Sequence, residues 1–386
     1  MKDCAPRVLF FVPVPNPEKG LTGAVLGSQT VREAASAVFD TQIVAMRHSA
    51  IRDSKTGVSP GIVWRSIADH GQSLRDLRTA VREREDQPLT VYMVANSSLA
   101  ASLRDYTSML TVSGLRPDAR FVLHSRNGNF FFPKGGLQRA VRRRMLERAD
   151  RIICLSRRLL PSTAELETLL PGLTEKLYVI PNTIDQALVP DAVQLATTHQ
   201  RSGPLRVLYL SNFIPSKGYK ILGEAARLLA SEGLANAFRF VFRGKWISED
   251  QRRAFVGLFD PVLLENGMID VGGPLWDRGA VQAELLASDA FCLPTRYPPE
   301  AMPRSIIEAM ACRCAIIAND HAAIADLVTD RRGGLLCKDI GARDIADFLR
   351  TTDRTALSAM GDASLAHFSE NFAQAIHDRR VVEVLR

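Results

Sequence analysis

Two glutamates, Glu300 and Glu308, stand eight positions apart in a segment that follows the short apolar run 290–293. Between them, Pro303 suits the first turn of a helix, because its missing N–H would have no partner within the helix there. Four apolar residues supply a buried face for this helix: Ile306, Ile307, Met310 and Ala311. We therefore expect Glu300 in the loop before the helix and Glu308 about a turn and a half inside it.

This arrangement suits a nucleotide sugar. The N-terminus of a helix presents N–H groups and a partial positive charge, so a diphosphate can bind there. Glu300 would then reach hydroxyl groups of the sugar, and the two carboxylate oxygens of Glu308 would accept hydrogen bonds from the ribose hydroxyls. Two glutamates at this spacing can also be solvated charges that flank a helix, and the spacing alone leaves that alternative open.

The segment resembles the Glu-x7-Glu element of glycosyltransferase family 4, a large family of retaining enzymes with the two-domain GT-B fold. Its usual form there is Glu-Gly-Phe-Pro-x-x-x-Leu-Glu-Ala-Met, and this chain keeps both glutamates and the proline. Ala301 replaces the usual glycine, so its side chain narrows the expected donor pocket. The resemblance implies a catalytic-site role for Glu300 and a donor-binding segment made of Ala301, Met302, Pro303, Arg304, Ser305 and Glu308.

A second feature of the resemblance is the pair Lys217-Gly218, just after the apolar run 205–210. A lysine at this turn can reach a diphosphate as a point charge. Family members usually carry an arginine several residues earlier, where this chain has Asn212. We expect Arg243 or Arg304 to replace the missing cation. As alternatives, Lys217 is a surface lysine and Arg243 a structural ion-pair partner.

His124 ends the apolar run 120–124, and family 4 enzymes often place a histidine at this strand end, near the donor sugar. A neutral imidazole there can hydrogen-bond a donor hydroxyl, so we expect His124 at the catalytic site. Gly23 closes a glycine-containing loop, residues 18–23, whose backbone can approach an anion. A satisfied structural histidine and a flexible turn are the alternatives for these two residues.

Apolar runs alternate with helix-length segments along the chain, which favours parallel sheets covered on both faces. The runs are 7–12, 41–45, 90–95, 120–124, 151–155, 177–180, 205–210, 239–243, 268–271, 290–293, 314–318 and 334–337. We expect an α/β protein of the GT-B kind with two facing Rossmann-like domains. The expected parts are an acceptor-side domain (1–185), a linker (186–204), a nucleotide-sugar domain (205–367) and a helix returning to the first domain (368–386).

A motif at the end of the first domain, Ile180-Pro181-Asn182-Thr183-Ile184-Asp185, is similar to an element at the family's domain junction and predicts hinge geometry. In another segment, residues 137–158, eight arginines accompany an apolar stripe of Leu137, Val141, Leu146 and Ala149 that we expect to face the core. The arginines from Arg139 to Arg158 suit an anionic membrane surface, and a solvated face is an equal alternative.

Bulk composition limits the class of protein. A chain of 386 residues exceeds what one hydrophobic core usually supports, which favours two domains. The net charge of +7 favours anionic partners, among which we expect a nucleotide sugar and no nucleic acid. Six scattered cysteines and the absence of about 18 consecutive apolar residues predict a reducing cytoplasm and a soluble or peripheral protein.

The chain contains no Asp-x-Asp pair and no HExxH, so we expect no metal ion and no cofactor. The interpretation is a retaining, metal-independent glycosyltransferase that uses a UDP- or GDP-sugar and a saccharide or lipid-linked acceptor. The expected role is in bacterial cell-surface polysaccharide or glycolipid synthesis, at the inner face of the cytoplasmic membrane. Two alternatives stay open: a GT-B-like sugar-nucleotide 2-epimerase and an inactive GT-B binding module.

Overall fold

The computed structural model describes residues 6–14, 23–47, 60–83, 87–328 and 332–386. The chain divides into two compact units. The first unit joins Met1–Pro181 with the last residues, Ala375–Arg386, and the second unit spans Asn182–Gln374. Each unit is built around a six-stranded parallel sheet, which confirms the expected α/β class.

The sheet of the first unit has the strand order β2-β1-β3-β4-β5-β6, with every neighbouring pair parallel. Its strands are β1 (Arg7–Pro13), β2 (Asp40–Met46), β3 (Leu89–Ala95), β4 (Arg120–Ser125), β5 (Arg151–Cys154) and β6 (Leu177–Val179). In β1 six consecutive residues are buried. Strands covered on both faces need apolar side chains in both directions, which is why they are visible as continuous apolar runs.

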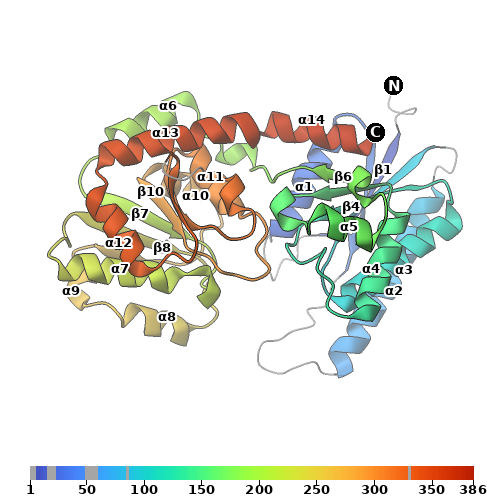
Figure 1. Ribbon diagram of the computed structural model, residues 1–386, viewed down its shortest axis with the longest axis horizontal. Helices are drawn as coiled ribbons and strands as arrows, with labels where there is room; N and C mark the ends of the chain where they lie inside the picture. The colour runs from blue at the N-terminus through green and yellow to red at the C-terminus, as the bar shows by residue number, and fades with distance from the viewer. Residues whose placement is uncertain (1–5, 15–22, 48–59, 84–86, 329–331) are drawn as a thin grey trace. The chain divides into compact units, whose positions relative to one another are not determined.

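The helices of the first unit divide between the two faces of this sheet (Figure 1). They are α1 (Gly23–Ser36), α2 (Pro60–Arg82), α3 (Leu99–Leu115), α4 (Gly136–Arg148), α5 (Thr163–Leu169) and α14 (Gln374–Leu385). Leu9 and Phe11 of β1 pack with α2, α3 and α4, whereas Val8 and Phe10 pack with α1 and α14. This alternation follows from the two-residue period of a strand.

The last helix, α14, belongs to the first unit, as the GT-B expectation requires. Its buried residues Val381, Val384 and Leu385 join the core that contains α1. Two arginines satisfy carbonyl groups at its C-terminal end: Arg151 donates to the carbonyl of Val384 at 3.0 Å, and Arg120 donates to that of Arg386 at 2.6 Å. Carbonyls at this end have no partner within the helix, so the arginines anchor α14.

The arginine-rich helix α4 departs from the sequence expectation in two ways. Val141, Leu146 and Ala149 are buried as expected, but Leu137 is 63% exposed, because it lies in the first turn beyond the edge of the core. Arg142 is 2% exposed and donates to the carbonyls of Asn129, Phe130 and Ser97. Arg142 therefore supports the fold of the first unit and is not available to a membrane.

The sheet of the second unit has the order β12-β11-β10-β7-β8-β9, again all parallel. Its strands are β7 (Leu205–Leu210), β8 (Phe238–Arg243), β9 (Ile269–Val271), β10 (Ala290–Leu293), β11 (Ala315–Asn319) and β12 (Gly334–Cys337). Its α-helices are α6 (Ala192–Thr197), α7 (Tyr219–Ser231), α8 (Glu249–Val256), α9 (Pro261–Glu265), α10 (Arg278–Leu286), α11 (Arg304–Ala311), α12 (Ala342–Thr351) and α13 (Arg354–Asn371). In both sheets, every expected strand is present with ends shifted by at most one residue.

The segment 186–204, which we expected to be a linker, contains helix α6 and lies within the second unit. Asp191 and Gln194 form a capping box at its start, in which each side chain accepts a hydrogen bond from the other residue's N–H. The helix has no buried residue, so it leaves no apolar periodicity in the sequence. Among the described residues, no helix is long and apolar enough to cross a bilayer.

Candidate functional site

Three loops meet at the carboxyl end of the second sheet, after β7, β8 and β10. The backbone N–H of Arg296 donates to the carbonyl of Ser216 at 2.7 Å, and that of Phe213 donates to Lys245 at 3.0 Å. Gly218 has φ +82°, and a Cβ there would lie 2.3 Å from the carbonyl oxygen of Pro294. Glycine is therefore required at this turn, both for its backbone conformation and for the close approach.

The loop between β10 and α11 carries most of the predicted site residues and is held from several directions. Asn182 donates to the carbonyl of Met302 at 2.8 Å, and the ring of His321 donates to that of Tyr297 at 2.9 Å. The backbone N–H of Ala323 donates to Ala301 at 3.0 Å. The side chains of Ala301 and Met302 are 6% and 4% exposed, so these two residues shape the loop from beneath.

Helix α11 begins at Arg304, and Pro303 is the residue before it, where we had expected the proline within the first turn. No side chain caps this N-terminus, and Arg304 and Ser305 are its first two residues. The expected apolar face is buried: Ile306, Ile307, Met310 and Ala311 are all fully inaccessible. The helix therefore presents an uncapped N-terminus on a rigid, buried support.

Lys217 and Glu300 come together at this end of the sheet. The Nζ atom of Lys217 lies 3.2 Å from Oε2 of Glu300 and 5.3 Å from the centre of the Tyr297 ring. Both charged side chains are partly buried, with 16% and 11% of their surface exposed. The sequence predicted both residues for the site, and the structure adds that their two charges form an ion pair.

Glu308 lies on the second turn of α11 and is 7% exposed. Burial raises the pKa of its carboxyl group. The positive charges of Arg278 and Arg304 oppose this rise, and the negative charge of Asp185 adds to it. The Nη2 atom of Arg278 is 3.6 Å from Oε1 of Glu308, and its Nε atom is 3.7 Å from Oδ2 of Asp185. These distances are too long for hydrogen bonds, so Arg278 attracts both carboxylates without hydrogen-bonding to either.

Arg278 is a neighbour of Glu308 that the sequence analysis did not predict. Its Nε and Nη2 atoms are buried and have no hydrogen-bond partner among the described residues. The residue opens α10, one position after the cap Asp277, and no spacing in the sequence connects it with Glu308. Asp185 was noticed only as part of a junction motif, although its charge faces the same arginine.

Arg243, one of two candidates to replace the missing cation near Asn212, is held by carboxylates. Its Nη2 atom lies 2.7 Å from Asp270, and its Nε atom lies 3.0 Å from Glu284. The hydrogen bond to Asp270, with the charge of Glu284, raises the pKa of its guanidinium group. The structure brings Arg304 to the start of α11 and leaves Arg243 in a matched ion-pair network.

In the first unit, His124 lies at the carboxyl end of β4 and is 1% exposed. Its Nδ1 atom is 2.7 Å from the hydroxyl of Tyr92 on β3. Burial lowers the pKa of the imidazole well below its usual range, and the charges of Arg126 and His377 lower it further. His124 is therefore neutral near pH 7. Gly23 is the first residue of α1, and loop residues 18–22 before it lie outside the described residues.

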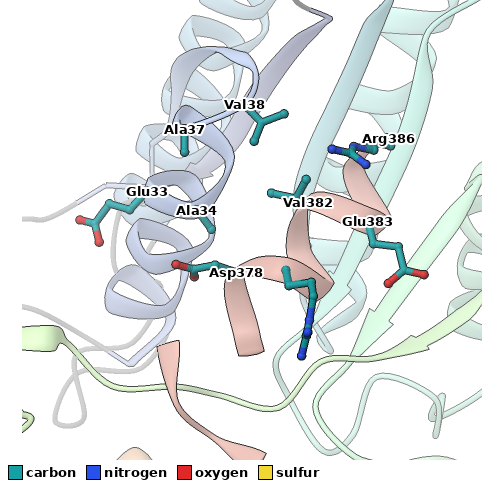
Figure 2. A pocket seen from close by; sticks show the side chains of 9 residues that line it. Glu33, Ala34, Ala37, Val38, Asp378, Val382, Glu383 and Arg386 are labelled. Carbon is teal, nitrogen blue, oxygen red and sulfur yellow. The ribbon is translucent and has the colours of Figure 1, made fainter. Parts of the chain in front are cut away.

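A cavity of about 490 Å³ opens elsewhere on the first unit, between α1 and α14. Figure 2 shows its lining, in which Ala34 and Val38 lie on the side of α1 towards Val382 and Arg386. None of the predicted site residues lines it. Among the described residues there is also no group of three or more His, Cys, Asp or Glu side chains placed to hold a metal ion.

Solved structures with the same fold cover almost the whole chain. Anabaena HepE, solved in complex with UDP and glucose, aligns with a TM-score of 0.66 at 15% identity, over 98% of this chain and 99% of that one. The sucrose-phosphate synthase of Thermosynechococcus elongatus aligns with a TM-score of 0.66 at 15% identity, over 98% of both chains. At these identities the likeness shows the fold, and it confirms the expected GT-B fold.

Curated relatives match over a shorter stretch. A putative colanic acid biosynthesis glycosyltransferase, WcaL of Salmonella typhimurium, is 26% identical over 191 residues, which is 47% of this chain and 45% of that protein. The amylovoran biosynthesis glycosyltransferase AmsK of Erwinia amylovora is 24% identical over 210 residues, 53% of this chain and 50% of that protein. The matched part of the chain spans about half the length of these relatives.

The family model for glycosyl transferases group 1 matches residues 195–352, which lie entirely within the second unit. The matched stretch contains Lys217, Arg278, Glu300 and Glu308, the charged residues brought together at the carboxyl end of the second sheet. This stretch of the second unit is thus similar to the glycosyl transferases group 1 family, the kind of enzyme that the glutamate pair suggested.

Proposed function

We propose that this protein is a retaining, metal-independent glycosyltransferase. It would transfer a sugar from a UDP- or GDP-sugar to a saccharide or lipid-linked acceptor, in bacterial cell-surface polysaccharide or glycolipid synthesis. The observation that carries the proposal is the uncapped start of α11, with the Lys217–Glu300 ion pair beside it and Glu308 one turn further along. The relatives named for colanic acid and amylovoran synthesis support the polysaccharide setting.

Each part of a nucleotide sugar has a matching group in the second unit. The diphosphate would lie at the N-terminus of α11, where the helix dipole and Lys217 stabilise the charge that grows as the phosphate leaves. Glu308 would accept hydrogen bonds from the ribose, and Glu300 from hydroxyls of the transferred sugar. For Glu300 to do so, Lys217 must exchange its carboxylate partner for phosphate, which is the more highly charged anion.

Retention of the anomeric configuration would follow from attack on the same face as the departing diphosphate, whose oxygen takes the proton of the acceptor hydroxyl. Residues Arg304 and Ser305 would hold the diphosphate through the first turn of α11, above the closely packed Ala301 and Met302. His124 would donate a hydrogen bond to the sugar, and Gly23 would allow backbone groups to approach it. Arg304 is our candidate for the cation that replaces the arginine missing near Asn212.

The decisive experiment starts with thermal shifts of the purified protein in a panel of UDP- and GDP-sugars, since a ligand that binds only the folded state raises the apparent stability. The stabilising donor is then supplied with its sugar labelled, together with candidate acceptors. Label in a second molecule supports transfer. Isomerised free donor would instead establish the 2-epimerase, and tight binding without any turnover would establish an inactive binding module.

We also propose that the exposed arginines of α4 hold the protein at the anionic inner face of the cytoplasmic membrane. Arg139, Arg143 and Arg144 are exposed on this helix beside the exposed side chain of Leu137. A basic helix with apolar neighbours gains both electrostatic attraction and apolar burial at an anionic bilayer. Within the wider range Arg139–Arg158, Arg142 and Arg151 are engaged inside the first unit and take no part.

Co-sedimentation with vesicles tests this membrane contact. The double variant Arg143→Glu, Arg144→Glu should lose binding to vesicles that contain anionic lipid. The matched control is Arg252→Glu, Arg253→Glu on α8, two neighbouring arginines that each contact a carboxylate one turn away, as Arg143 and Arg144 do. Equal sedimentation of the native protein with anionic and neutral vesicles would end the membrane proposal.

A further inference from the structure

His124 has one ring nitrogen satisfied and one unsatisfied. Its Nδ1 atom is hydrogen-bonded to the Tyr92 hydroxyl at 2.7 Å, whereas its Nε2 atom is buried and has no hydrogen-bond partner among the described residues. A buried polar atom without a partner costs about 1–3 kcal/mol, so such an atom in a folded protein calls for a ligand or a function. The histidine is almost completely inaccessible, which makes its tautomer a property of its neighbours.

Tyr92 is itself constrained by Arg126, the second residue after His124. The Arg126 guanidinium hydrogen-bonds to the Tyr92 hydroxyl. An arginine can only donate, so the phenolic oxygen accepts that bond and keeps its own proton for a different acceptor. The acceptor within reach is Nδ1 of His124. Burial also raises the pKa of Tyr92 to about 12, which keeps the hydroxyl proton in place at neutral pH.

The position of Arg126 depends on a missing side chain in α1. A Cβ atom on Gly27 would lie 1.6 Å from Nη2 of Arg126 and 2.0 Å from its Cζ. The glycine thus provides the space in which the guanidinium lies beside Tyr92. Three elements, α1, β3 and the end of β4, converge on the same hydrogen-bond chain.

We propose that Tyr92 is a positioning residue which, oriented by Arg126, holds His124 as the tautomer protonated at Nε2, so that this nitrogen donates to an oxygen of the bound nucleotide sugar. In this chain of hydrogen bonds Arg126 donates to the Tyr92 oxygen, and the Tyr92 hydroxyl donates to Nδ1 of His124. The oxygen that accepts from Nε2 is a hydroxyl or phosphoryl oxygen. The identity of this acceptor rests on the proposed transferase function, whereas the tautomer does not.

The tautomer is read directly by ¹⁵N NMR of the full-length protein labelled at histidine, with the His124 signals assigned by their loss in His124→Gln. We expect the Nε2 shift in the protonated range and the Nδ1 shift in the unprotonated range near pH 7. Tyr92→Phe should shift both signals toward the mean of the two tautomers. Tyr178→Phe, which removes a hydroxyl from β6 of the same sheet, is the matched control and should leave both signals in place.

Gly27→Ala tests Arg126 without touching either partner. The added methyl group displaces the guanidinium, which is the flexible end of its side chain, so the Tyr92 hydroxyl loses its fixed direction. We expect the same tautomer averaging as in Tyr92→Phe. The control is Gly71→Ala in α2, where nothing lies within 4 Å of the new Cβ. A His124 signal protonated at Nδ1 in the native protein, or unchanged signals in both Tyr92→Phe and Gly27→Ala, would overturn the proposal.

Turnover separates the positioning role from a merely structural one. If Nε2 donates to the reacting sugar, Tyr92→Phe should lower kcat about tenfold with a smaller change in the donor KM, measured well below a Tm that the loss of the buried hydroxyl also lowers. A normal tautomer with no transfer in the native protein would leave the hydrogen-bond chain standing and remove only the proposed transferase. Averaged tautomers with unchanged kcat would show that Nε2 donates to no reacting oxygen.

Discussion

Both units place polar residues at the carboxyl end of a parallel sheet, but the residues in the second unit form ion pairs and the histidine in the first unit is neutral. In the second unit the residues are charged and paired at 3.2 to 3.7 Å: Lys217 with Glu300, and Arg278 with Glu308 and Asp185. In the first unit a neutral histidine is held by a tyrosine hydroxyl. Loose ion pairs can exchange partners with an anionic ligand, whereas a closed hydrogen-bond chain fixes one proton in one place.

The strongest test of the charged site removes its lysine. Lys217→Met should lower kcat/KM for the nucleotide sugar about a hundredfold or more, because the positive charge of Lys217 stabilises the negative charge that develops on the leaving diphosphate in the transition state. Steady-state kinetics measure the effect, and Lys220→Met, an exposed lysine three residues further on, is the control. Equal activity of the two variants would mean that the comparison has assigned the charge to the wrong residue.

The glycine that brings the loops together gives the next largest effect. Gly218→Ala combines a positive φ with a clash against Pro294, and we expect a loss of about 2–5 kcal/mol in the free energy of unfolding. Gly233→Ala has nearly the same φ, +80°, with nothing within 4 Å of the new Cβ, and should lose only about 1–2 kcal/mol. Denaturant unfolding of both variants isolates the cost of the clash. Equal losses would show that the turn and the loop after β10 are not tightly packed.

Whether a residue of the fold or of the candidate site can be predicted from the sequence depends on how close along the chain the residues that it contacts lie. The strands can be predicted because each is a continuous apolar run. Lys217, Glu300 and Glu308 can be predicted because each lies a short, fixed distance after such a run. Arg278 cannot be predicted in this way, since only the folded chain brings it to Glu308. Tyr92 cannot be predicted for the same reason, because it lies 32 residues before His124, inside an ordinary apolar strand. Helix α6 is invisible because it buries nothing.

The pH dependence of donor binding should report on Glu308 in the second unit. Burial raises the pKa of Glu308 above its ordinary value of 4.5, and its ionised form is the one that accepts two ribose hydroxyls. Donor affinity should therefore weaken as the pH falls through the raised pKa, and Glu308→Gln should bind roughly tenfold more weakly with this pH dependence removed. Calorimetric titration at several pH values measures it. A dependence that survives in Glu308→Gln would move the titrating group elsewhere.

The same raised pKa has a consequence for stability without ligand. The folded state holds the Glu308 proton at pH values where the unfolded chain has lost it, so this contribution to stability is complete below about 4.5 and is lost as the pH rises through the folded pKa. Glutamine cannot ionise and avoids that loss. Glu308→Gln should consequently have a higher Tm than the native protein at neutral pH while binding the donor less well, a combination that a purely structural glutamate would not produce.

The smallest expected effect concerns the cation that replaces the arginine missing near Asn212. Arg304→Met should weaken donor binding about fivefold or less, because its charge acts on the diphosphate from a partly exposed position at the start of α11. Arg243→Met should mainly lower Tm, because it leaves Asp270 and Glu284 without their shared partner. Calorimetry and thermal unfolding of both variants, with Arg252→Met as a partly exposed control, separate the two roles. If neither variant changes donor affinity, no arginine has replaced the missing one, and the diphosphate must rely on Lys217 and the α11 dipole alone.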